Sequence, residues 1–304
     1  MAITIPAALK RDRLLQSALR AFKNRINPIL AFATKFEDQP LEGTDIVRVP
    51  YYSLATGAST DFVPANGYNV VQAQTVGTRA VTVNRRKYRM LDVTSVEVNR
   101  QPYLDVEKAI GLEAEKLADD VLSDVFSVVT AANYGTTTLA AMAATAFDVD
   151  DALLLRRLCS EANWPAAGRS LVLDSTFAEY LLRDARVGNA NYDSPDAVRE
   201  GRVPRVAGFD VREVPLLPLN GAEKIAGMAA MPSALAFATA PIRPAATLTS
   251  TVLDYKIVTD SDTGLSLEYR RFGDAKMDTV FELIECNYGY AALESAALKR
   301  ITIP

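Results

Sequence analysis

Hydrophobic residues at a helical period predict one long helix in the first half of the chain. Between about residues 104 and 129 the apolar positions recur every three or four residues, at Val106, Ile110, Ala114, Leu117, Val121, Val125 and Val128. No proline interrupts the run, and Pro102 lies near its start, where proline is tolerated. The polar side is mostly acidic, with Glu107, Glu113, Glu115, Asp119, Asp120 and Asp124. We therefore predict a long amphipathic helix with an acidic polar side.

A shorter helical stripe lies at the N-terminus. Leu15, Leu19 and Phe22 share one face of a helix predicted over Leu9–Phe22, and Pro28 ends it. The basic residues of this region face a single acid, Asp12; they are Lys10, Arg11, Arg13, Arg20, Lys23, Arg25 and Lys35. Two interpretations stay open. The helix either packs on its own domain or forms an arm that lies on a neighbouring subunit or an internal partner.

Between these helices the pattern changes to two strands separated by a long excursion. Alternating residues predict strands over Ile46–Tyr52 and Thr75–Met90. Consecutive strands usually pair through a turn of about two to five residues. Here roughly twenty residues intervene, and the region carries four aromatic residues, Tyr51, Tyr52, Phe62 and Tyr68. Such a loop is too long for a compact domain on its own.

The rest of the chain mixes short helices with strands. Asp148 is predicted to cap a helix through about Ala162, and Thr176 with Glu179 forms a capping box for a helix to about Asp184. Strands are predicted over 169–173, Gly208–Val214, Tyr255–Thr259, Leu265–Arg271 and Val280–Tyr288. Because the strands and helices do not alternate regularly, the fold class is α+β rather than a parallel α/β sheet.

Composition restricts the classes of function. The chain has 304 residues, 49% of them hydrophobic and 23% charged, and its net charge is −4, as expected for a globular protein with a large core. This balance argues against tight binding of nucleic acid. The N-terminus lacks a signal peptide and no segment is apolar enough to span a membrane, so we expect a soluble intracellular product.

Candidate chemistry is sparse. The chain has no histidine, which removes Ser-His-Asp and Cys-His nucleophile systems and imidazole metal sites. No P-loop and no glycine-rich dinucleotide motif follows a strand. Cys159 and Cys286 are far apart and in no metal spacing, so we interpret them as reduced core residues. No cofactor is predicted.

Four groups of charged residues are candidate sites. The stretch 260–264 resembles part of a calcium loop but lacks ligands, and a polar turn between strands explains it better. The acid pairs Asp119–Asp120 and Asp150–Asp151 lie on predicted helices among solvated charges, which does not favour catalysis. The basic run 85–87 lacks matching aromatic residues and indicates a solvated or intersubunit charge patch rather than a nucleic-acid platform.

The order of the parts resembles that of the HK97-fold major capsid proteins of tailed bacteriophages. Four stretches carry the resemblance: 164–184, 199–218, 231–244 and 265–293. The second contains a glycine, a basic residue and a later Gly-Phe-x-Val, and the fourth looks like the closing strands of that family. The resemblance covers nearly the whole chain from about residue 40.

This resemblance implies a domain plan. It places an N-terminal arm at 1–45, an extended E-loop hairpin at 46–90 and a peripheral domain at 91–146 with its spine helix at about 104–129. A mainly axial domain follows at 147–242, and 243–304 is the closing β-rich segment of the peripheral domain. On this plan the excursion is a surface built for another copy of the chain.

The implied function is that of a non-catalytic shell protein, located in the virion capsid and assembled in the host bacterial cytoplasm. Its partners would be copies of itself as pentamers and hexamers, a separate scaffolding protein, a portal protein, and packaged double-stranded DNA without sequence-specific contact, with room for a decoration protein. No membrane contact is expected. Residues 49–80 contain no lysine, so covalent cross-linking through this loop is not expected. The residues predicted at subunit interfaces are Tyr51, Tyr52, Phe62, Val63, Pro64, Tyr68, Arg85, Arg86, Lys87, Phe22, Arg25 and Pro218.

Two other interpretations remain open. An encapsulin-like compartment shell would share the fold and assemble alone around a cargo enzyme. An α+β enzyme that uses carboxylates without histidine would stay monomeric and form no particles.

Overall fold

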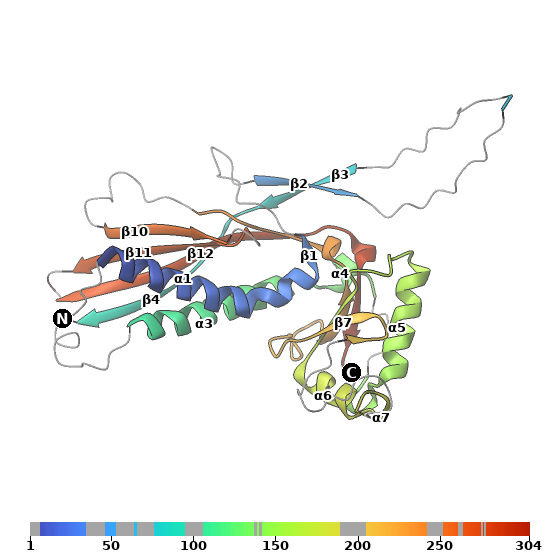
Figure 1. Ribbon diagram of the computed structural model, residues 1–304. Coiled ribbons are helices and arrows are strands. Elements are labelled where there is room, and N and C mark those ends of the chain that lie inside the picture. The colour runs from blue at the N-terminus through green and yellow to red at the C-terminus, as the bar shows by residue number, and fades with distance from the viewer. Residues whose placement is uncertain are drawn as a thin grey trace.

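A computed structural model describes most of the chain (Figure 1). The described residues are 7–34, 46–52, 64–65, 76–94, 106–136, 139, 142–188, 205–241, 252–260, 264–274, 276 and 278–304. They form two sheets with helices packed on them and a separate pair of strands that extends away from the body. The α+β class predicted from the sequence is confirmed.

The larger sheet is built around one long strand. β12 (Thr279–Ala292) pairs with β11 (Ser266–Asp274) on one side; on the other side its first part pairs with β4 (Arg85–Thr94) and its last part with β9 (Leu235–Thr239). β10 (Val252–Thr259) and the short β1 (Ala33–Thr34) extend the sheet at its two ends. All pairs are antiparallel except β1 with β9.

Two helices cover one face of this sheet (Figure 1). α3 (Val106–Phe126) corresponds to the long helix predicted at about 104–129, and α1 (Ala7–Ile26) lies beside it. Ile284, Cys286 and Tyr288 alternate along β12 toward the helices and are buried among their apolar residues. The apolar residues that recur along α3 every three or four positions therefore pack in one core with the alternate residues of β12.

The smaller sheet is mixed and lies beside the C-terminal end of α3. Its strands, in spatial order, are β13 (Leu298–Thr302), β8 (Ile225–Ala230), β5 (Ser170–Leu173), β7 (Phe209–Glu213) and β6 (Arg205–Val206), with only β5 and β7 parallel. Its helices are α4 (Ala131–Tyr134), α5 (Val149–Glu161), α6 (Ser175–Arg183) and α7 (Ala185–Gly188). Short 3₁₀ turns are η1 (Asn27–Ala31), η2 (Ala144–Ala146), η3 (Pro232–Ala234) and η5 (Ser295–Ala297).

The smaller sheet contributes to two cores. Leu171 and Leu173 on β5 pack with α5 and α6, whereas Val172 between them belongs to the core of α1 and α3. β8 divides in the same way, with Met228 in the larger core and Ala229 in the smaller one. Because one sheet supplies both cores, the two halves of the body are joined by buried apolar side chains.

A third, small cluster fixes the base of the strand pair. β2 (Ile46–Tyr52) and β3 (Val76–Thr82) are antiparallel and lie on the face of the larger sheet opposite α1 and α3 (Figure 1). Val47, Val49 and Val81 pack there on Ala236 and Ala238 of β9. The small alanine side chains let the strand pair approach the sheet closely.

The single strand predicted over Thr75–Met90 is wrong. Val83 and Asn84 interrupt it, so that β3 pairs with β2 while β4 pairs with β12. The alternation of apolar residues runs through both pieces, and only the pairing partners separate them. β4 therefore belongs to the larger sheet, which shortens the predicted hairpin region 46–90.

The predicted helix starts have different outcomes. Asp148 caps α5, accepting hydrogen bonds from the backbone N–H groups of Asp150 (2.8 Å) and Asp151 (3.2 Å), as predicted. The capping box predicted at Thr176 is wrong, because Asp174 is the N-cap, accepts from the Thr176 N–H at 3.0 Å, and starts α6 two residues earlier than predicted. The Thr176 N–H donates to the Asp174 carboxylate, so Asp174 rather than Thr176 caps the helix.

Candidate assembly surfaces

The charged pairs that could have formed a catalytic site hold structural partners. Asp119 accepts from the Arg25 guanidinium, with Nη2 to Oδ2 at 3.3 Å, and Asp120 pairs with Arg89 at 3.0 Å. Among the described residues, no group of acids and cysteines is arranged to hold a metal ion. In the same part of the chain, no helix is both long enough and apolar enough to cross a membrane.

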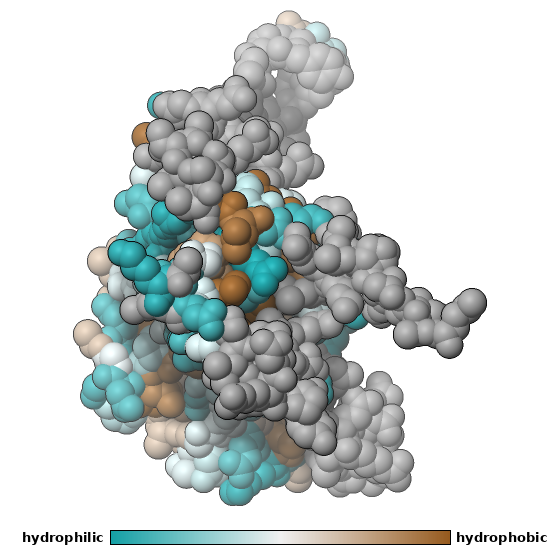
Figure 2. Space-filling model, turned by 90° about the vertical axis from the view of Figure 1, so that its left-hand side faces the viewer, coloured by the Kyte–Doolittle hydropathy of each residue, from teal (hydrophilic) through white to brown (hydrophobic). Residues whose placement is uncertain are grey.

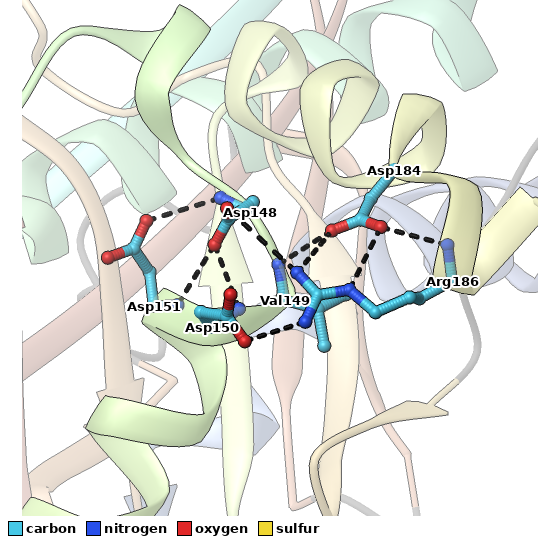
Figure 3. Close-up of polar contacts among 6 residues, drawn as sticks. All are labelled: Asp148, Val149, Asp150, Asp151, Asp184 and Arg186. Carbon is cyan, nitrogen blue, oxygen red and sulfur yellow. Dashed lines mark hydrogen bonds and ion pairs between the residues drawn. The ribbon is translucent and has the colours of Figure 1, made fainter.

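The second acid pair lies in a cluster around Arg186 (Figure 3). The guanidinium reaches Asp150 at 2.6 Å, Asp184 at 3.1 Å and Asp148 at 3.9 Å. The hydrogen bond from Arg186 lowers the pKa of Asp150, whereas burial raises the pKa of Asp151. Opposite shifts of this kind can suit acid–base catalysis. Here, however, Asp151 completes the α5 capping box and Asp150 neutralises Arg186, so both are occupied.

Both cysteines are buried and chemically quiet. Burial raises the pKa of Cys159 to about 11 and that of Cys286 further still. Since the thiolate is the reactive form, neither thiol is prepared to act as a nucleophile at neutral pH. They fill the two cores, as expected from the sequence.

The stretch interpreted as a polar turn joins β10 to β11. The Gly264 N–H donates to the Asp260 carbonyl at 2.8 Å, and Gly264 has a positive φ of 66°. The Asp260 carboxylate pairs with Lys23 at 2.9 Å. Residues 261–263 of this stretch lie outside the described residues. The ion pair ties the C-terminal end of α1 to the end of the sheet.

The N-terminal helix packs on its own chain. Leu15, Ala18 and Leu19 are buried against α3, and Phe22 is fully buried. The expectation that Phe22 lies at a subunit interface is therefore wrong, since its side chain is in its own core. Arg25 likewise pairs with α3 of the same chain. Of the two interpretations left open, the structure supports a helix that packs on its own domain.

The basic run on β4 also finds partners within the chain. Arg85 and Lys87 face α3 and lie 3.6 Å and 3.0 Å from the Asp124 carboxylate, while Arg86 faces the other way and contacts Glu285 at 2.6 Å. Burial alone would raise the pKa of Asp124. Hydrogen bonds from Tyr288 and Lys87 and the charges of Lys87 and Arg85 outweigh it, and the net pKa is lowered. The three basic residues of this run therefore form ion pairs within the chain. Only the exposed portions of their side chains are accessible to a neighbouring subunit.

Other predicted interface residues lie on or beyond the β2–β3 pair. Tyr51 and Tyr52 end β2, but their side chains lie outside the described residues, as do Phe62, Val63 and Tyr68 entirely. Pro64 is exposed. Pro218 is half-buried in the loop after β7, where its carbonyl accepts from the Gly221 N–H at 3.1 Å.

Exposed apolar side chains do not gather into one surface. Among the described residues, Ile46, Leu112, Leu153 and Leu253 are exposed on four different elements, and Tyr88 and Met90 are exposed on one face of β4. Seen from the end of the larger sheet, the described surface is mostly hydrophilic with separate small brown groups (Figure 2). The described part of the body thus offers scattered contacts to a partner.

Three residues that the sequence did not single out organise the body. Arg169 is buried and donates to the carbonyls of Pro165 and Trp164 just after α5. Arg300 is also buried and pairs with Glu223, which accepts from the Ala131 N–H at 3.0 Å. Gly289 leaves room for the chain at Thr82. No local motif marks Arg300 and Gly289, because their partners are distant in sequence, whereas the carbonyls that Arg169 contacts are only four and five residues away.

Comparison with known proteins was informative at the level of structure. No protein-family model matches the sequence, and no curated protein is significantly similar to it. Solved structures, in contrast, match along nearly the whole chain. The capsid of the cyanophage P-SCSP1u aligns with a TM-score of 0.60 at 14% identity, covering 90% of this chain and 86% of that one.

Two further structures agree. A chain of Mycobacterium phage Che8 aligns with a TM-score of 0.53 at 17% identity, covering 86% of this chain and 85% of that one. The mature capsid of bacteriophage PhiM1 gives 0.52 at 11% identity, with 90% and 86% coverage. These identities are too low to transfer function, but the alignments span both chains. The chain therefore has a phage capsid fold, as its resemblance to the HK97-fold proteins predicts.

Proposed function

We propose that this chain is the major capsid protein of a tailed phage or prophage, a non-catalytic protein that self-assembles into an icosahedral shell around the genome. The observation that carries the proposal is a capsid fold that aligns over 90% of this chain and 86% of each capsid chain. A fold shared only over a common core would leave room for another function. Here the match covers 90% of this chain and 86% of the cyanophage P-SCSP1u chain.

The parts of the structure are assigned accordingly. α3 is the spine helix, and the larger sheet with α1 and α3 is the peripheral domain. The smaller sheet with α4 to α7 is the axial domain, and the β2–β3 pair is the base of the E-loop. What supports the last assignment is that these strands leave the body and are fixed to it only at their base, by Val47, Val49 and Val81 (Figure 1).

We assign the subunit contacts chiefly to the E-loop. Tyr51, Tyr52, Phe62, Val63 and Tyr68 would bury their side chains on a neighbouring copy, each contributing about 1.5–3 kcal/mol before ordering costs if fully buried. The exposed Pro64 fits that role. An isolated two-stranded ribbon is marginal in water, so a neighbour would also stabilise the loop itself.

The charges of the body fit a shell that encloses DNA without gripping it. Arg85, Arg86 and Lys87 of β4 pair with acids of the same chain, so this basic run is already neutralised and offers little to phosphates. Assembly would use a separate scaffolding protein and a portal protein, with pentamers and hexamers as the units. Because Arg25 and Lys23 are paired within the chain, the scaffold contact is not assigned to them.

Negative-stain microscopy tests the proposal. The protein would be expressed alone and together with the products of its neighbouring genes. Closed shells of uniform size that appear with a scaffold are the expected result. Shells that form alone around a cargo enzyme would favour a compartment protein instead. A protein that stays monomeric in both cases would contradict any shell function and favour an enzyme.

A further inference from the structure

β4 is attached to the body with little help from apolar burial. Of its ten residues, only Val93 is buried. β11, on the other side of β12, differs, since Ser266, Leu267, Glu268 and Tyr269 are all buried. Local stability follows the density of buried contacts, so β4 is expected to open more easily than the strands around it.

The position of β4 in the sheet also favours opening. It pairs with β12 along its whole length, from Arg85 opposite Tyr288 to Thr94 opposite Thr279. On its other side, no strand among the described residues pairs with it. Opening would therefore break one ladder of backbone hydrogen bonds rather than two.

Ion pairs on both faces take the place of apolar contacts. Toward α3, Arg85 and Lys87 meet Asp124, and Arg89 meets Asp120 at 3.0 Å and Glu113 at 3.8 Å. Two residues of strand advance by about 6.6 Å and one turn of helix by about 5.4 Å, so the basic residues on this face of β4 follow the helix: Arg85 and Lys87 meet Asp124, and Arg89 meets Asp120 one turn away. Toward the other face, Arg86 donates to Glu285 at 2.8 and 2.6 Å.

Most of these pairs are open to salt. The side chains of Arg85, Lys87 and Asp124 are 48%, 33% and 29% exposed, and those of Arg89 and Asp120 are 34% and 35% exposed. Such pairs are weakened as the screening length falls from about 10 Å at 0.1 M salt to about 3 Å at 1 M. Glu285 is only 1% exposed and stays less screened.

We propose that β4 is a strand held by charge, which opens and closes as a unit while the two cores stay intact, with ionic strength setting the open fraction. β4 follows the β2–β3 pair after only Val83 and Asn84. The base of that pair keeps its own apolar anchor on β9. Opening would therefore uncouple the strand pair from α3 without releasing it from the body. The inference does not depend on the proposed function.

Hydrogen exchange read by mass spectrometry tests this on the full chain. Amide exchange in 85–94 and in 266–274 is compared at about 0.05 M and about 1 M NaCl. We expect exchange in β4 to rise by about tenfold at high salt, and exchange in β11 to change by less than about twofold. Light scattering at both salt concentrations reports whether the assembly state also changes.

Variants separate this effect from assembly, because their exchange is compared with that of the unchanged chain first at about 0.05 M NaCl and then at about 1 M. Asp124→Asn and Lys87→Gln should each speed exchange in β4 and reduce its response to salt. Glu115→Gln, an exposed acid on the same helix without a β4 partner in the described contacts, should leave both unchanged. Asp124→Asn also removes the acceptor of the Tyr288 hydroxyl. Lys87→Gln tests the ion pair with Asp124 without changing that acceptor. Equal protection of β4 and β11, or exchange in β4 that ignores both salt and Lys87→Gln, would overturn the proposal.

Discussion

Gly289 marks the point at which the chain leaving the β2–β3 pair crosses β12. A Cβ at this position would lie 2.2 Å from the Thr82 carbonyl oxygen and 2.7 Å from its carbon. Both are backbone atoms, which cannot rotate away as a side chain can. The crossing therefore requires glycine for closeness of approach.

Replacing Gly289 with alanine should destabilise the folded chain. The added methyl group overpacks the crossing, and we expect a loss of about 1–3 kcal/mol in the free energy of unfolding, measured in urea. Gly111→Ala is the matched control. Gly111 lies on α3 with nothing within 4 Å of an added Cβ, so alanine should stabilise the helix by about 0.4–1 kcal/mol. Equal effects from the two substitutions would contradict the role of Gly289.

Protonation of Asp124 should lower the free energy of unfolding at acid pH. Its pKa is lowered below 3.8 in the folded protein, so the unfolded chain binds more protons in acid. Its contribution is present above pH 3.8 and is lost as the pH falls through the lowered folded value. Asp124→Asn should reduce the fall in unfolding free energy as the pH drops below 3.8. Glu115→Gln serves as the control, and an unchanged pH dependence in Asp124→Asn would contradict the assignment.

Residue roles were predictable only where the partner is near in sequence. Asp148 was identified as a cap because its donors are two and three residues away. Arg86 and Glu285 pair across 199 positions, so the sequence showed a basic run but not its partner. Phe22 was assigned to an interface for the same reason, since an apolar stripe does not tell which surface covers it.

At the scale of elements, α1 is a part of the body. Phe22→Ala should lower the free energy of unfolding by about 3–5 kcal/mol, because the ring is fully buried against α3. Arg20→Ala, on the exposed side of the same helix, should change it by less than about 0.5 kcal/mol. Urea unfolding of the unassembled chain provides the measurement. A small effect of Phe22→Ala would contradict this packing and favour the interpretation of α1 as an arm that lies on a neighbouring subunit.

The start of α5 depends on one carboxylate. Asp148→Ala removes the acceptor for two backbone N–H groups and should cost about 1 kcal/mol in thermal or urea unfolding. Asp148→Asn keeps an acceptor oxygen and should retain most of that stability. If both variants behave alike, charge rather than capping is the source of the effect, because the asparagine also loses the 3.9 Å pair with Arg186.

Elements were predictable to the extent that their period is local. The long helix and strand β2 appeared where the hydrophobic pattern placed them. The break between β3 and β4 did not, because Val81 and Val83 continue the alternation through it. The break arises because β3 pairs with β2 whereas β4 pairs with β12. The alternation of apolar and polar residues does not show which distant strand each segment pairs with.

The whole molecule should unfold as one unit because the smaller sheet supplies both cores. Trp164, the single tryptophan, lies in the smaller core and donates to the Ala296 carbonyl at 2.8 Å. Its fluorescence reports that half, whereas far-ultraviolet circular dichroism reports all helices and strands. We expect the two signals to change at the same urea concentration. A fluorescence transition clearly apart from the dichroism transition would show that the halves unfold separately.

The charges along β4 also disfavour edge-to-edge pairing with β4 of a second chain. A long edge strand with free backbone groups is a template for fibrous polymers, and in a cell that makes many copies such growth would compete with any closed assembly. Arginine and lysine at four of the first five positions of β4 make a second β4 a poor partner, because like charges would lie opposite one another. The residues that tie the strand to α3 would therefore also disfavour edge-to-edge pairing of two chains at β4.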